Sequence, residues 1–316
     1  MLTNIALLVL GFIILIKGAD LFVDGSCGLA RNFKVSKMLI GLTIVSFGTS
    51  APEFAVSIKS LLAGNGDITL GNVIGSNILN ILLIIGCSSF IHSLQVKNST
   101  VKKELPITIL MTSLFALLLS DNIFDSGIKN TFTRADGITV LLFFSVFIYY
   151  LISMSRKKIE VDKDDEIISL PKATIYILIG LTGIILGSNF VVDTAVILAK
   201  TLGVSERLIA LTIIALGTSL PELVTSLVAT KKGEYDIAIG NVVGSNIFNI
   251  GIVIGIPVSI LGGIGVINFS YIDLLVMIIS AIFLFMFAFN DYKISKKEGF
   301  LFLMLFTIYY SYVLGS

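Results

Sequence analysis

The segment Gly-Thr-Ser-Ala-Pro-Glu at 48–53 lies inside an apolar run long enough to cross a lipid bilayer. Its last two residues, Pro52 and Glu53, are unexpected there. Proline interrupts helical hydrogen bonding, and a carboxylate at membrane depth costs about 3 kcal/mol even on the lenient insertion scale. The same pattern, Gly-Thr-Ser-Leu-Pro-Glu, returns at 217–222 in a second apolar run. An ionisable side chain at this depth indicates a functional site, and this chain has two in matching surroundings.

The rest of the chain has the composition of a protein that crosses the bilayer many times. Of its 316 residues, 55% are hydrophobic and 14% are charged, and the net charge of +1 gives no case for nucleic acid or for an acidic partner. The expected surroundings are a lipid bilayer, and no protein partner is implied. Ten apolar runs reach about the 17 to 25 residues that a spanning helix requires. They lie near 4–24, 38–63, 68–91, 105–121, 136–154, 173–193, 207–230, 236–261, 271–289 and 298–315.

The two halves of the chain are copies of each other. A shift of 169 residues aligns 11–81 with 180–250 without a gap, and 32 of the 71 positions are identical. The identities include polar residues such as Asn72 and Asn241, which convergent hydrophobicity would not align. Five spans per copy is an odd number, so the second copy must enter the membrane in the opposite orientation. The predicted fold class is therefore an all-α membrane protein of ten transmembrane helices, arranged as two inverted five-helix repeats with broken helices at the central ion sites.

Domain organisation and orientation follow from this repeat. We expect a first inverted repeat at 1–154, a cytoplasmic linker at 155–172 and a second inverted repeat at 173–316. If successive loops alternate sides, sixteen of the 22 Lys and Arg residues fall on one side and four on the other. The basic side is the cytoplasmic one. We therefore predict a multi-pass protein of the cytoplasmic membrane with both termini outside the cytoplasm.

Inverted repeats bring equivalent positions together near the bilayer midplane, which predicts that Glu53 and Glu222 face each other. A second repeated block, Gly-Asn-Val-x-Gly-Ser-Asn-Ile-x-Asn, occupies 71–80 and 240–249. Within it a serine and an asparagine lie four residues apart, on one face of a helix. The candidate cation ligands from the two blocks are Glu53, Glu222, Thr49, Thr218, Ser76, Ser245, Asn80 and Asn249.

This set of oxygen ligands suits a hard cation. Calcium accepts six to eight oxygens from carboxylates, carbonyls and water. Cysteine and histidine, which bind zinc and copper, are absent from both blocks. Two carboxylates carry a charge of −2, which one Ca²⁺ neutralises and three Na⁺ exceed by one. No nucleophile, base and orienting group can be assembled from these blocks, so we expect no enzymatic activity and no cofactor.

Two plainer interpretations stay open. In the first, Pro52 and Pro221 merely kink their helices, and the glutamates pair with Lys59 or with a hydroxyl group. In the second, the serine and asparagine side chains of the second block serve as hydrogen bonds between helices, as such residues do in membranes.

At these two blocks the chain resembles the cation/Ca²⁺ exchanger superfamily, specifically its prokaryotic sodium/calcium exchangers. The resemblance covers both repeats and the ten-span layout. It implies an electrogenic Na⁺/Ca²⁺ antiporter with four central sites, in which Glu53 and Glu222 are the main calcium ligands, assisted by Thr49 and Thr218. It also implies that the first and sixth spans slide across the other eight. The sodium ligands that it implies are Ser50, Ser76, Ser219, Ser245, the two threonines and the backbone carbonyls of Ser46 and Ala215.

The chain departs from the family pattern at two places. Some relatives, including potassium-dependent exchangers, have aspartate at the position of Asn249, whereas both Asn80 and Asn249 are neutral here. This argues against K⁺ coupling. The equivalent residues Ser46 and Ala215 also differ from each other, so the two outer sodium sites are not expected to be identical.

The leading hypothesis is a secondary antiporter that exchanges Na⁺ for Ca²⁺. The alternative is a Ca²⁺/H⁺ antiporter that uses the same glutamates as proton carriers, although the proton-coupled branch of the superfamily usually has an acid in its second block. A third hypothesis, a passive cation channel, predicts flux that does not depend on a counter-ion.

Overall fold

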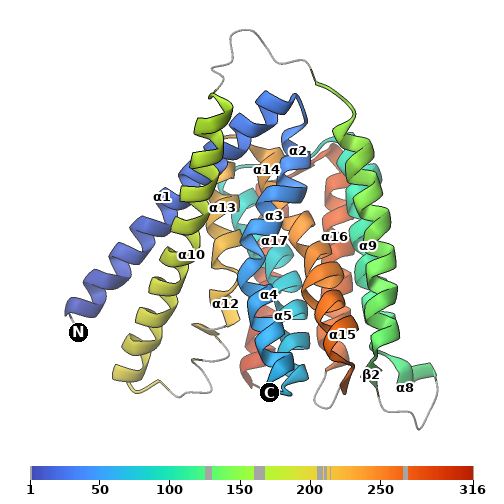
Figure 1. Cartoon of the computed structure of the whole chain (residues 1–316). Coiled ribbons are helices and arrows are strands. Elements are labelled where there is room, and N and C mark those ends of the chain that lie inside the picture. Colours follow the sequence, from blue (N-terminus) through green and yellow to red (C-terminus); the bar gives the residue numbers. More distant parts are fainter. Residues whose placement is uncertain are drawn as a thin grey trace.

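The computed structural model describes residues 2–124, 130–159, 168–204, 209, 212–213, 215–265 and 270–315. Within them the chain is mostly helical (Figure 1), and η denotes a π-helix. In the first half the elements are α1 (Leu2–Phe33), α2 (Lys37–Ile40), η1 (Gly41–Val45), α3 (Ser46–Thr49), α4 (Ala51–Leu62), α5 (Gly66–Leu79), η2 (Asn80–Ile85), α6 (Gly86–Ile91), β1 (Leu94–Gln95), η3 (Thr100–Glu104), α7 (Leu105–Leu118), α8 (Asp121–Phe124), β2 (Thr131–Phe132) and α9 (Arg134–Ser155). In the second half they are α10 (Leu170–Thr201), α12 (Ala215–Gly217), α13 (Leu220–Lys231), α14 (Tyr235–Phe248), η5 (Asn249–Ile254), α15 (Gly255–Leu261), β3 (Ile264–Gly265), α16 (Tyr271–Asp291), β4 (Lys293–Ile294) and α17 (Lys296–Gly315).

Seven helices in the described part of the chain are long and apolar enough to cross a membrane. An eighth span results if Lys37–Thr49 and Ala51–Leu62, which meet at a bend of 44°, are taken together. These eight coincide with eight of the ten predicted spans. The predicted span at 105–121 is shorter in the structure, because α7 has 14 residues and continues from the π-helix η3. Part of the predicted span at 207–230, like residues 160–167 of the predicted linker, lies outside the described residues.

Helices α1 and α10 are longer than the sequence predicted, with 32 residues each. The predicted spans, 4–24 and 173–193, ended at the equivalent residues Asp24 and Asp193, but a helix continues past a charged side chain because its hydrogen bonds lie in the backbone. The two helices cross at glycines, where small residues let backbones approach closely. A Cβ atom on Gly180 would lie 2.5 Å from the Phe22 nitrogen and 2.7 Å from the Gly18 carbonyl oxygen. In Figure 1 the pair leans away from the other helices at its lower end.

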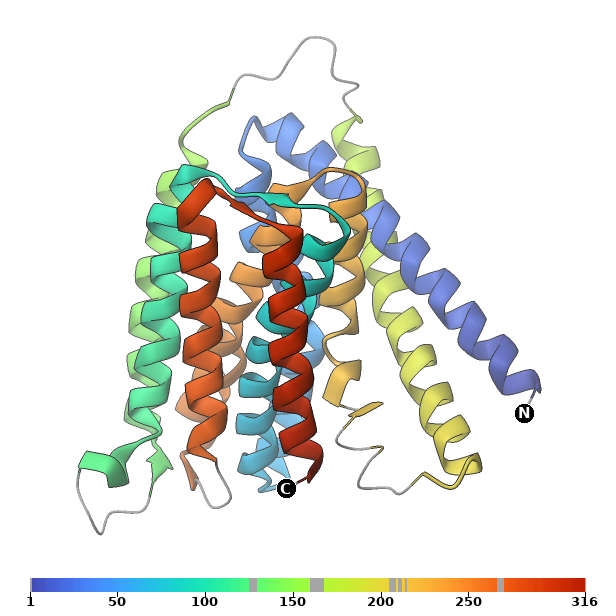
Figure 2. The same ribbon diagram turned by 180° about the vertical axis from the view of Figure 1, so that it is seen from behind.

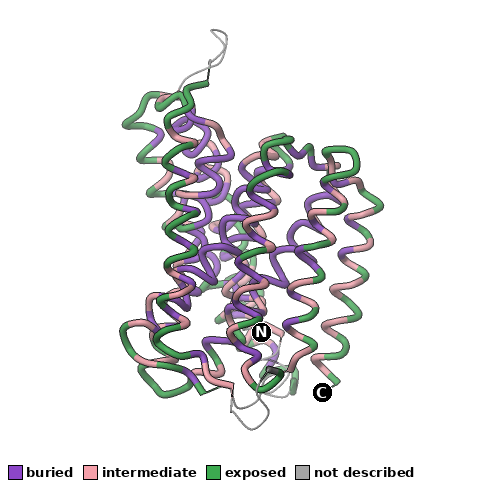
Figure 3. The backbone as a smooth tube through the Cα atoms, turned by 90° about the vertical axis from the view of Figure 1, so that its right-hand side faces the viewer, coloured by how far each residue is buried: buried purple, intermediate pink, exposed green. Residues whose placement is uncertain are grey.

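The remaining helices form a bundle around α14. Every residue of the chain from 237 to 250 is buried, and Figure 3 shows buried backbone through the middle of the molecule. The outer surface is apolar instead: Leu142, Val146 and Tyr149 on α9 are 63%, 62% and 74% exposed. An exposed apolar surface of this extent is what a lipid environment accommodates and water does not.

Two antiparallel ribbons connect loops at opposite ends of the molecule (Figure 2). Strand β1 pairs with β4, with Leu94 opposite Ile294, and β2 pairs with β3, with Phe132 opposite Ile264. Both chain termini lie toward the β2–β3 end. The loops of the predicted cytoplasmic side therefore gather at the β1–β4 end.

At the β1–β4 end, the loop between α13 and α14 is tied to α1. The Lys232 Nζ lies 2.6 Å from Asp24 Oδ1 and 2.7 Å from Asp20 Oδ1. Burial lowers the pKa of Lys232, but the hydrogen bonds and charges of Asp20 and Asp24 outweigh it and raise the pKa above its ordinary value. The ammonium group therefore stays charged at neutral pH. Two further ion pairs hold the same loop, Lys37 with Glu234 and Lys97 with Asp236.

Candidate cation site

Each Gly-Thr-Ser-x-Pro-Glu segment divides a span into two helices. Helix α3 ends at Thr49 and α4 begins at Ala51, while α12 ends at Gly217 and α13 begins at Leu220. The prolines lie in the first turn of α4 and α13, where a helix needs no N–H donor. Each proline therefore begins a new helix, and the glutamate after it lies in the first turn, where the helix dipole favours a negative charge.

The structure brings the two glutamates together. Glu53 is 0% exposed and Glu222 is 1% exposed, and the two carboxylates are close enough to repel each other. Ser50 Oγ donates to Glu222 Oε1 across 3.1 Å, which joins the motif of one repeat to the acid of the other. Two buried like charges oppose each other strongly, and either a cation between them or a proton on one of them would relieve the repulsion.

Two serines, one from each repeat, lie beside the Glu53 carboxylate. Ser76 and Ser219 are both adjacent to it, and their hydroxyl groups hydrogen-bond to each other at 3.2 Å. Asn80 lies one helical turn beyond Ser76 on the same face. It begins the π-helix η2, and its equivalent Asn249 begins η5. Single π-turns inside membrane helices are frequent at functional sites.

Several buried oxygens at this place have no hydrogen-bond donor. Leaving a buried polar oxygen unpaired costs free energy, most of all for a carboxylate, so each one needs an explanation. A hard cation supplies it, because such a cation binds through oxygens. Among the described residues, the unpaired oxygens of the predicted ligands are Glu53 Oε1 and Oε2, Glu222 Oε2, Asn80 Oδ1, Asn249 Oδ1 and Ser245 Oγ.

The alternative that the glutamates pair with Lys59 or with a hydroxyl group is met in part. Lys59 is exposed near the end of α4, whereas Glu53 is fully buried and, among the described residues, both its oxygens are unpaired. Glu222 does pair with a hydroxyl group, that of Ser50, through Oε1. Within the described residues, no group of three or more His, Cys, Asp or Glu side chains gathers.

Two asparagines that sequence analysis did not select connect the motifs across the repeats. Thr49 Oγ1 donates to Asn241 Oδ1 at 2.9 Å, and Thr218 Oγ1 donates to Asn72 Oδ1 at 3.4 Å. Asn241 also donates to the Glu222 carbonyl oxygen at 3.3 Å, as Asn72 does to that of Glu53 at 3.2 Å. The sequence did show that the same asparagine occurs in both repeats. That repetition does not distinguish an asparagine that binds the ion from one that positions a neighbouring ligand.

A second asparagine pair lies between α5 and α14. Asn77 Nδ2 donates to the Asn246 carbonyl oxygen at 3.3 Å, and Asn246 Nδ2 donates to that of Asn77 at 3.4 Å. Their side-chain oxygens accept from the next asparagines: Asn80 Nδ2 donates to Asn246 Oδ1 at 2.9 Å, and Asn249 Nδ2 donates to Asn77 Oδ1 at 3.0 Å. The interhelical reading of Asn80 and Asn249 is thus correct for their nitrogens, while their oxygens stay unpaired.

The last predicted pair, Ser46 and Ala215, lies in the helices before the breaks. Ser46 begins α3, is fully buried and donates weakly to the Thr43 carbonyl oxygen at 3.3 Å. Ala215 begins α12. The resemblance implied backbone carbonyl ligands at both positions.

Equivalent glycines of the two repeats differ in their surroundings. A Cβ on Gly240 would meet the Gly41 backbone at 3.0 Å, and one on Gly244 would meet Ser46 Oγ at 2.6 Å. Among the described residues, nothing lies within 4 Å of that position at the equivalents Gly71 and Gly75. The helix before the first break is therefore packed tightly on α14 at Gly240 and Gly244.

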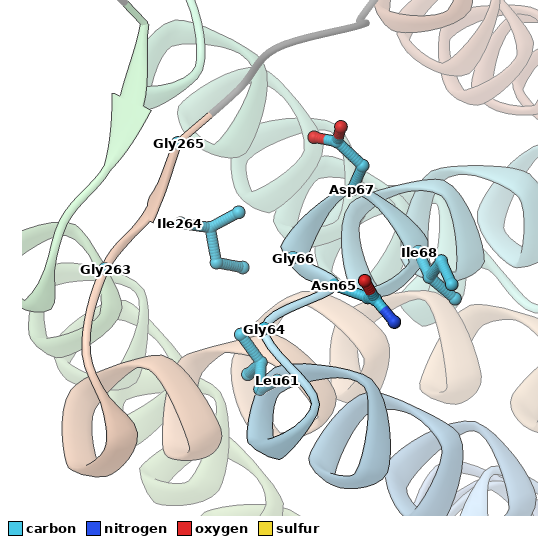
Figure 4. Close-up of a pocket in the computed structure, with 9 residues that line it drawn as sticks. All are labelled: Leu61, Gly64, Asn65, Gly66, Asp67, Ile68, Gly263, Ile264 and Gly265. Carbon is cyan, nitrogen blue, oxygen red and sulfur yellow. The ribbon is translucent and has the colours of Figure 1, made fainter.

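At the β2–β3 end, a hollow of about 410 Å³ lies between the α4–α5 loop and β3 (Figure 4). Ile264 points from β3 toward the loop, and a Cβ on Gly66 would come within 2.2 Å of Ile264 Cγ2. Only glycine fits at this position of the loop.

The sodium/calcium exchanger protein family matches residues 3–153 and 172–315. The chain belongs to this family. As a member, it is a multi-pass membrane transporter and not an enzyme.

Two of its relatives are similar to it over nearly the full length of both chains. CaxA of Alkalimonas amylolytica is 39% identical, covering 100% of both chains. The sodium/calcium exchanger MaX1 of Methanosarcina acetivorans is 28% identical over 97% of each chain. A solved structure of the sodium-calcium exchanger NCX_Mj aligns with a TM-score of 0.84 and 32% identity, covering 96% of this chain and 97% of that one. The family membership therefore rests on whole-chain similarity.

Proposed function

We propose that this protein is a secondary active antiporter that exchanges Na⁺ for Ca²⁺ across the cytoplasmic membrane by alternating access. The observation that carries the proposal is the set of buried, unpaired oxygens around Glu53 and Glu222. Two carboxylates and several neutral oxygens match the ligand number and type that Ca²⁺ prefers. The names of MaX1 and NCX_Mj as sodium/calcium exchangers support the same pair of substrates.

The proposed site has two kinds of ligand. Glu53 and Glu222 bind Ca²⁺ with the help of Thr49 and Thr218. The proposed remaining ligands, used chiefly for Na⁺, are Ser50, Ser219, Ser76, Ser245, Asn80, Asn249 and the carbonyls of Ser46 and Ala215. No resident cofactor is proposed, since both ions are substrates.

The proposed architecture is ten helices in two inverted repeats, at 1–154 and 173–316, joined by a cytoplasmic linker at 155–172. Two observations support it. The family matches the chain in two separate stretches that nearly coincide with these repeats. In addition, the contacts at the centre are reciprocal: residue pairs related by the shift of 169 exchange equivalent hydrogen bonds, as a two-fold axis requires.

Alternating access is supported by the repeat itself. Each copy contributes one broken helix, α3–α4 and α12–α13, and the two breaks meet where Ser50 donates to Glu222. Two copies in opposite orientation would give this site two equivalent routes, one to each side of the membrane. Because the basic loops gather at the β1–β4 end, we propose that this end faces the cytoplasm and that both termini lie outside.

The proposed exchange is electrogenic. One Ca²⁺ neutralises the two carboxylates, and about three Na⁺ would leave one positive charge, worth about 2.3 kcal/mol per 100 mV of membrane potential. The membrane potential therefore contributes to driving the exchange.

Sodium-driven uptake of ⁴⁵Ca tests the proposal. Proteoliposomes loaded with Na⁺ are expected to take up ⁴⁵Ca when diluted into Na⁺-free medium. Because three Na⁺ leave for each Ca²⁺ that enters, one positive charge moves out, so the uptake should increase when the vesicle interior is made positive. Uptake driven equally by a proton gradient alone would favour the Ca²⁺/H⁺ antiporter instead. Uptake that needs no counter-ion would identify a channel.

Transport is expected to be independent of K⁺. Asn80 and Asn249 are neutral, so the site offers no third carboxylate to balance an additional cation. Replacing K⁺ by choline on both sides of the membrane should leave the initial rate of Na⁺-driven ⁴⁵Ca uptake unchanged. A requirement for K⁺ at saturating Na⁺ would contradict this expectation.

A further inference from the structure

The four asparagines between α5 and α14 fix one another's amide orientation. An asparagine amide can rotate by half a turn and exchange its donor for its acceptor. A backbone carbonyl oxygen accepts only, so Asn77 must direct its Nδ2 toward the carbonyl of Asn246, and Asn246 must do the reverse. Asn77 and Asn246 are therefore each held in a single orientation.

The orientation of Asn246 and Asn77 fixes that of the two candidate ligands, Asn80 and Asn249. Once Asn246 has committed its Nδ2 to a carbonyl, its Oδ1 can only accept, and Asn80 satisfies it with its own Nδ2 at 2.9 Å. Asn249 does the same with Asn77 at 3.0 Å. The Oδ1 atoms of Asn80 and Asn249 are the groups left over, and both are buried and unpaired.

We propose that Asn77 and Asn246 are positioning residues for cation binding: they hold the amide oxygens of Asn249 and Asn80 toward the site and keep the N–H groups away. This inference deepens the proposed function and rests on it. A cation is attracted by an amide oxygen and repelled by an N–H group, so a freely rotating amide would be a poorer ligand. Asn77 acts through Asn249, and Asn246 acts through Asn80; neither Asn77 nor Asn246 contacts the ion.

The proposal separates two substitutions of Asn246 that are similar in size. Asn246→Leu removes the acceptor, so the Asn80 amide can rotate and present its nitrogen to the ion. Asn246→Asp keeps an oxygen that can accept from Asn80 Nδ2. We expect Asn246→Leu to raise the Na⁺ concentration for half-maximal ⁴⁵Ca uptake by about tenfold, the size of one directed hydrogen bond. Asn246→Asp should raise it far less, because the orientation of Asn80 is retained.

A double-mutant cycle with Asn80 distinguishes positioning from general stability. If Asn246 acts only through Asn80, the variant with both Asn246→Leu and Asn80→Ala should have the same half-saturating Na⁺ concentration as Asn80→Ala alone. The control cycle combines Asn77→Leu with Asn80→Ala. Because Asn77 holds Asn249 and not Asn80, these two effects should add.

The measurements use the full chain in proteoliposomes, with the folded fraction of each variant checked by gel filtration. Additive effects in the Asn246/Asn80 cycle, or equal damage from Asn246→Leu and Asn246→Asp, would overturn the positioning role while leaving the exchanger assignment in place. If the unmodified protein showed no Na⁺-driven ⁴⁵Ca uptake, the proposed function itself would fail, and this inference with it. A variant too unstable to assay is replaced by its repeat equivalent, Asn77→Leu or Asn77→Asp with Asn249→Ala, for which the same two results are decisive.

Discussion

Glu53→Gln and Glu222→Gln are each expected to abolish Na⁺-driven Ca²⁺ uptake while leaving the protein folded. Glutamine has the shape of glutamate but lacks its charge, so a Ca²⁺ ion at the site would keep one positive charge without compensation. A buried charge that loses its partner costs about 3–5 kcal/mol. We therefore expect Ca²⁺ binding to weaken by a factor of about 100 or more. Folding should be retained, because each substitution relieves the repulsion between two buried carboxylates.

The measurement is ⁴⁵Ca uptake into Na⁺-loaded proteoliposomes, alongside thermal unfolding of the purified variants. Glu298→Gln is the matched control, since Glu298 lies in the first turn of α17 and accepts from the Ser295 nitrogen and hydroxyl group. Glutamine serves in that position as well, so this variant should transport normally. Near-normal uptake by either Glu53→Gln or Glu222→Gln would show that the substituted glutamate is not a Ca²⁺ ligand.

Gly71→Leu is expected to stop transport without preventing Ca²⁺ binding. Among the described residues, nothing lies within 4 Å of a Cβ atom at Gly71, so we expect the observed arrangement to tolerate a side chain there. The proposed opposite arrangement would pack a helix on this face of α5, as Gly41 packs on Gly240, and the leucine would prevent it. Overpacking costs about 1–3 kcal/mol, which disfavours the opposite state by a factor of about 5 to 150.

The equivalent substitution Gly240→Leu should act in the other direction. Its side chain would collide with the Gly41 backbone, 3.0 Å from the Cβ position, so it destabilises the arrangement seen here. Comparing ⁴⁵Ca binding in detergent with ⁴⁵Ca uptake in vesicles separates trapping from misfolding. Uptake by Gly71→Leu at the rate of the unmodified protein would mean that α5 is not covered during transport.

Much of the fold could be predicted from the sequence, because both the apolar runs and the internal repeat can be read directly from the order of the residues. The apolar runs predicted the helices, and the shift of 169 indicated which residues are equivalent, such as Ser50 with Ser219. The lengths of α1 and α10 were not accessible, since the predicted apolar spans ended at residues 24 and 193 while the helices continue to Phe33 and Thr201. That the chain binds ions through the predicted residues stays a prediction.

Other features depend on contacts between the repeats that no local pattern encodes. Asn77 and Asn80 are the same residue type three positions apart, and only the carbonyl opposite each amide decides which one has an unpaired oxygen. The surroundings of equivalent glycines could not be predicted either. Gly71 and Gly240 occupy the same position in nearly identical blocks, yet of these two only Gly240 has close neighbours among the described residues.

The link from Lys232 to Asp20 and Asp24 has no repeat equivalent, since position 63 is alanine and position 189 is asparagine. In the proposed cycle, this end of α1 is therefore held by ion pairs that the equivalent residues of the other copy cannot make. We expect the apparent affinities for the ions to differ between the two sides of the membrane as a result. Because ion pairs weaken as salt is added, a higher ionic strength on the Lys232 side should make that difference smaller.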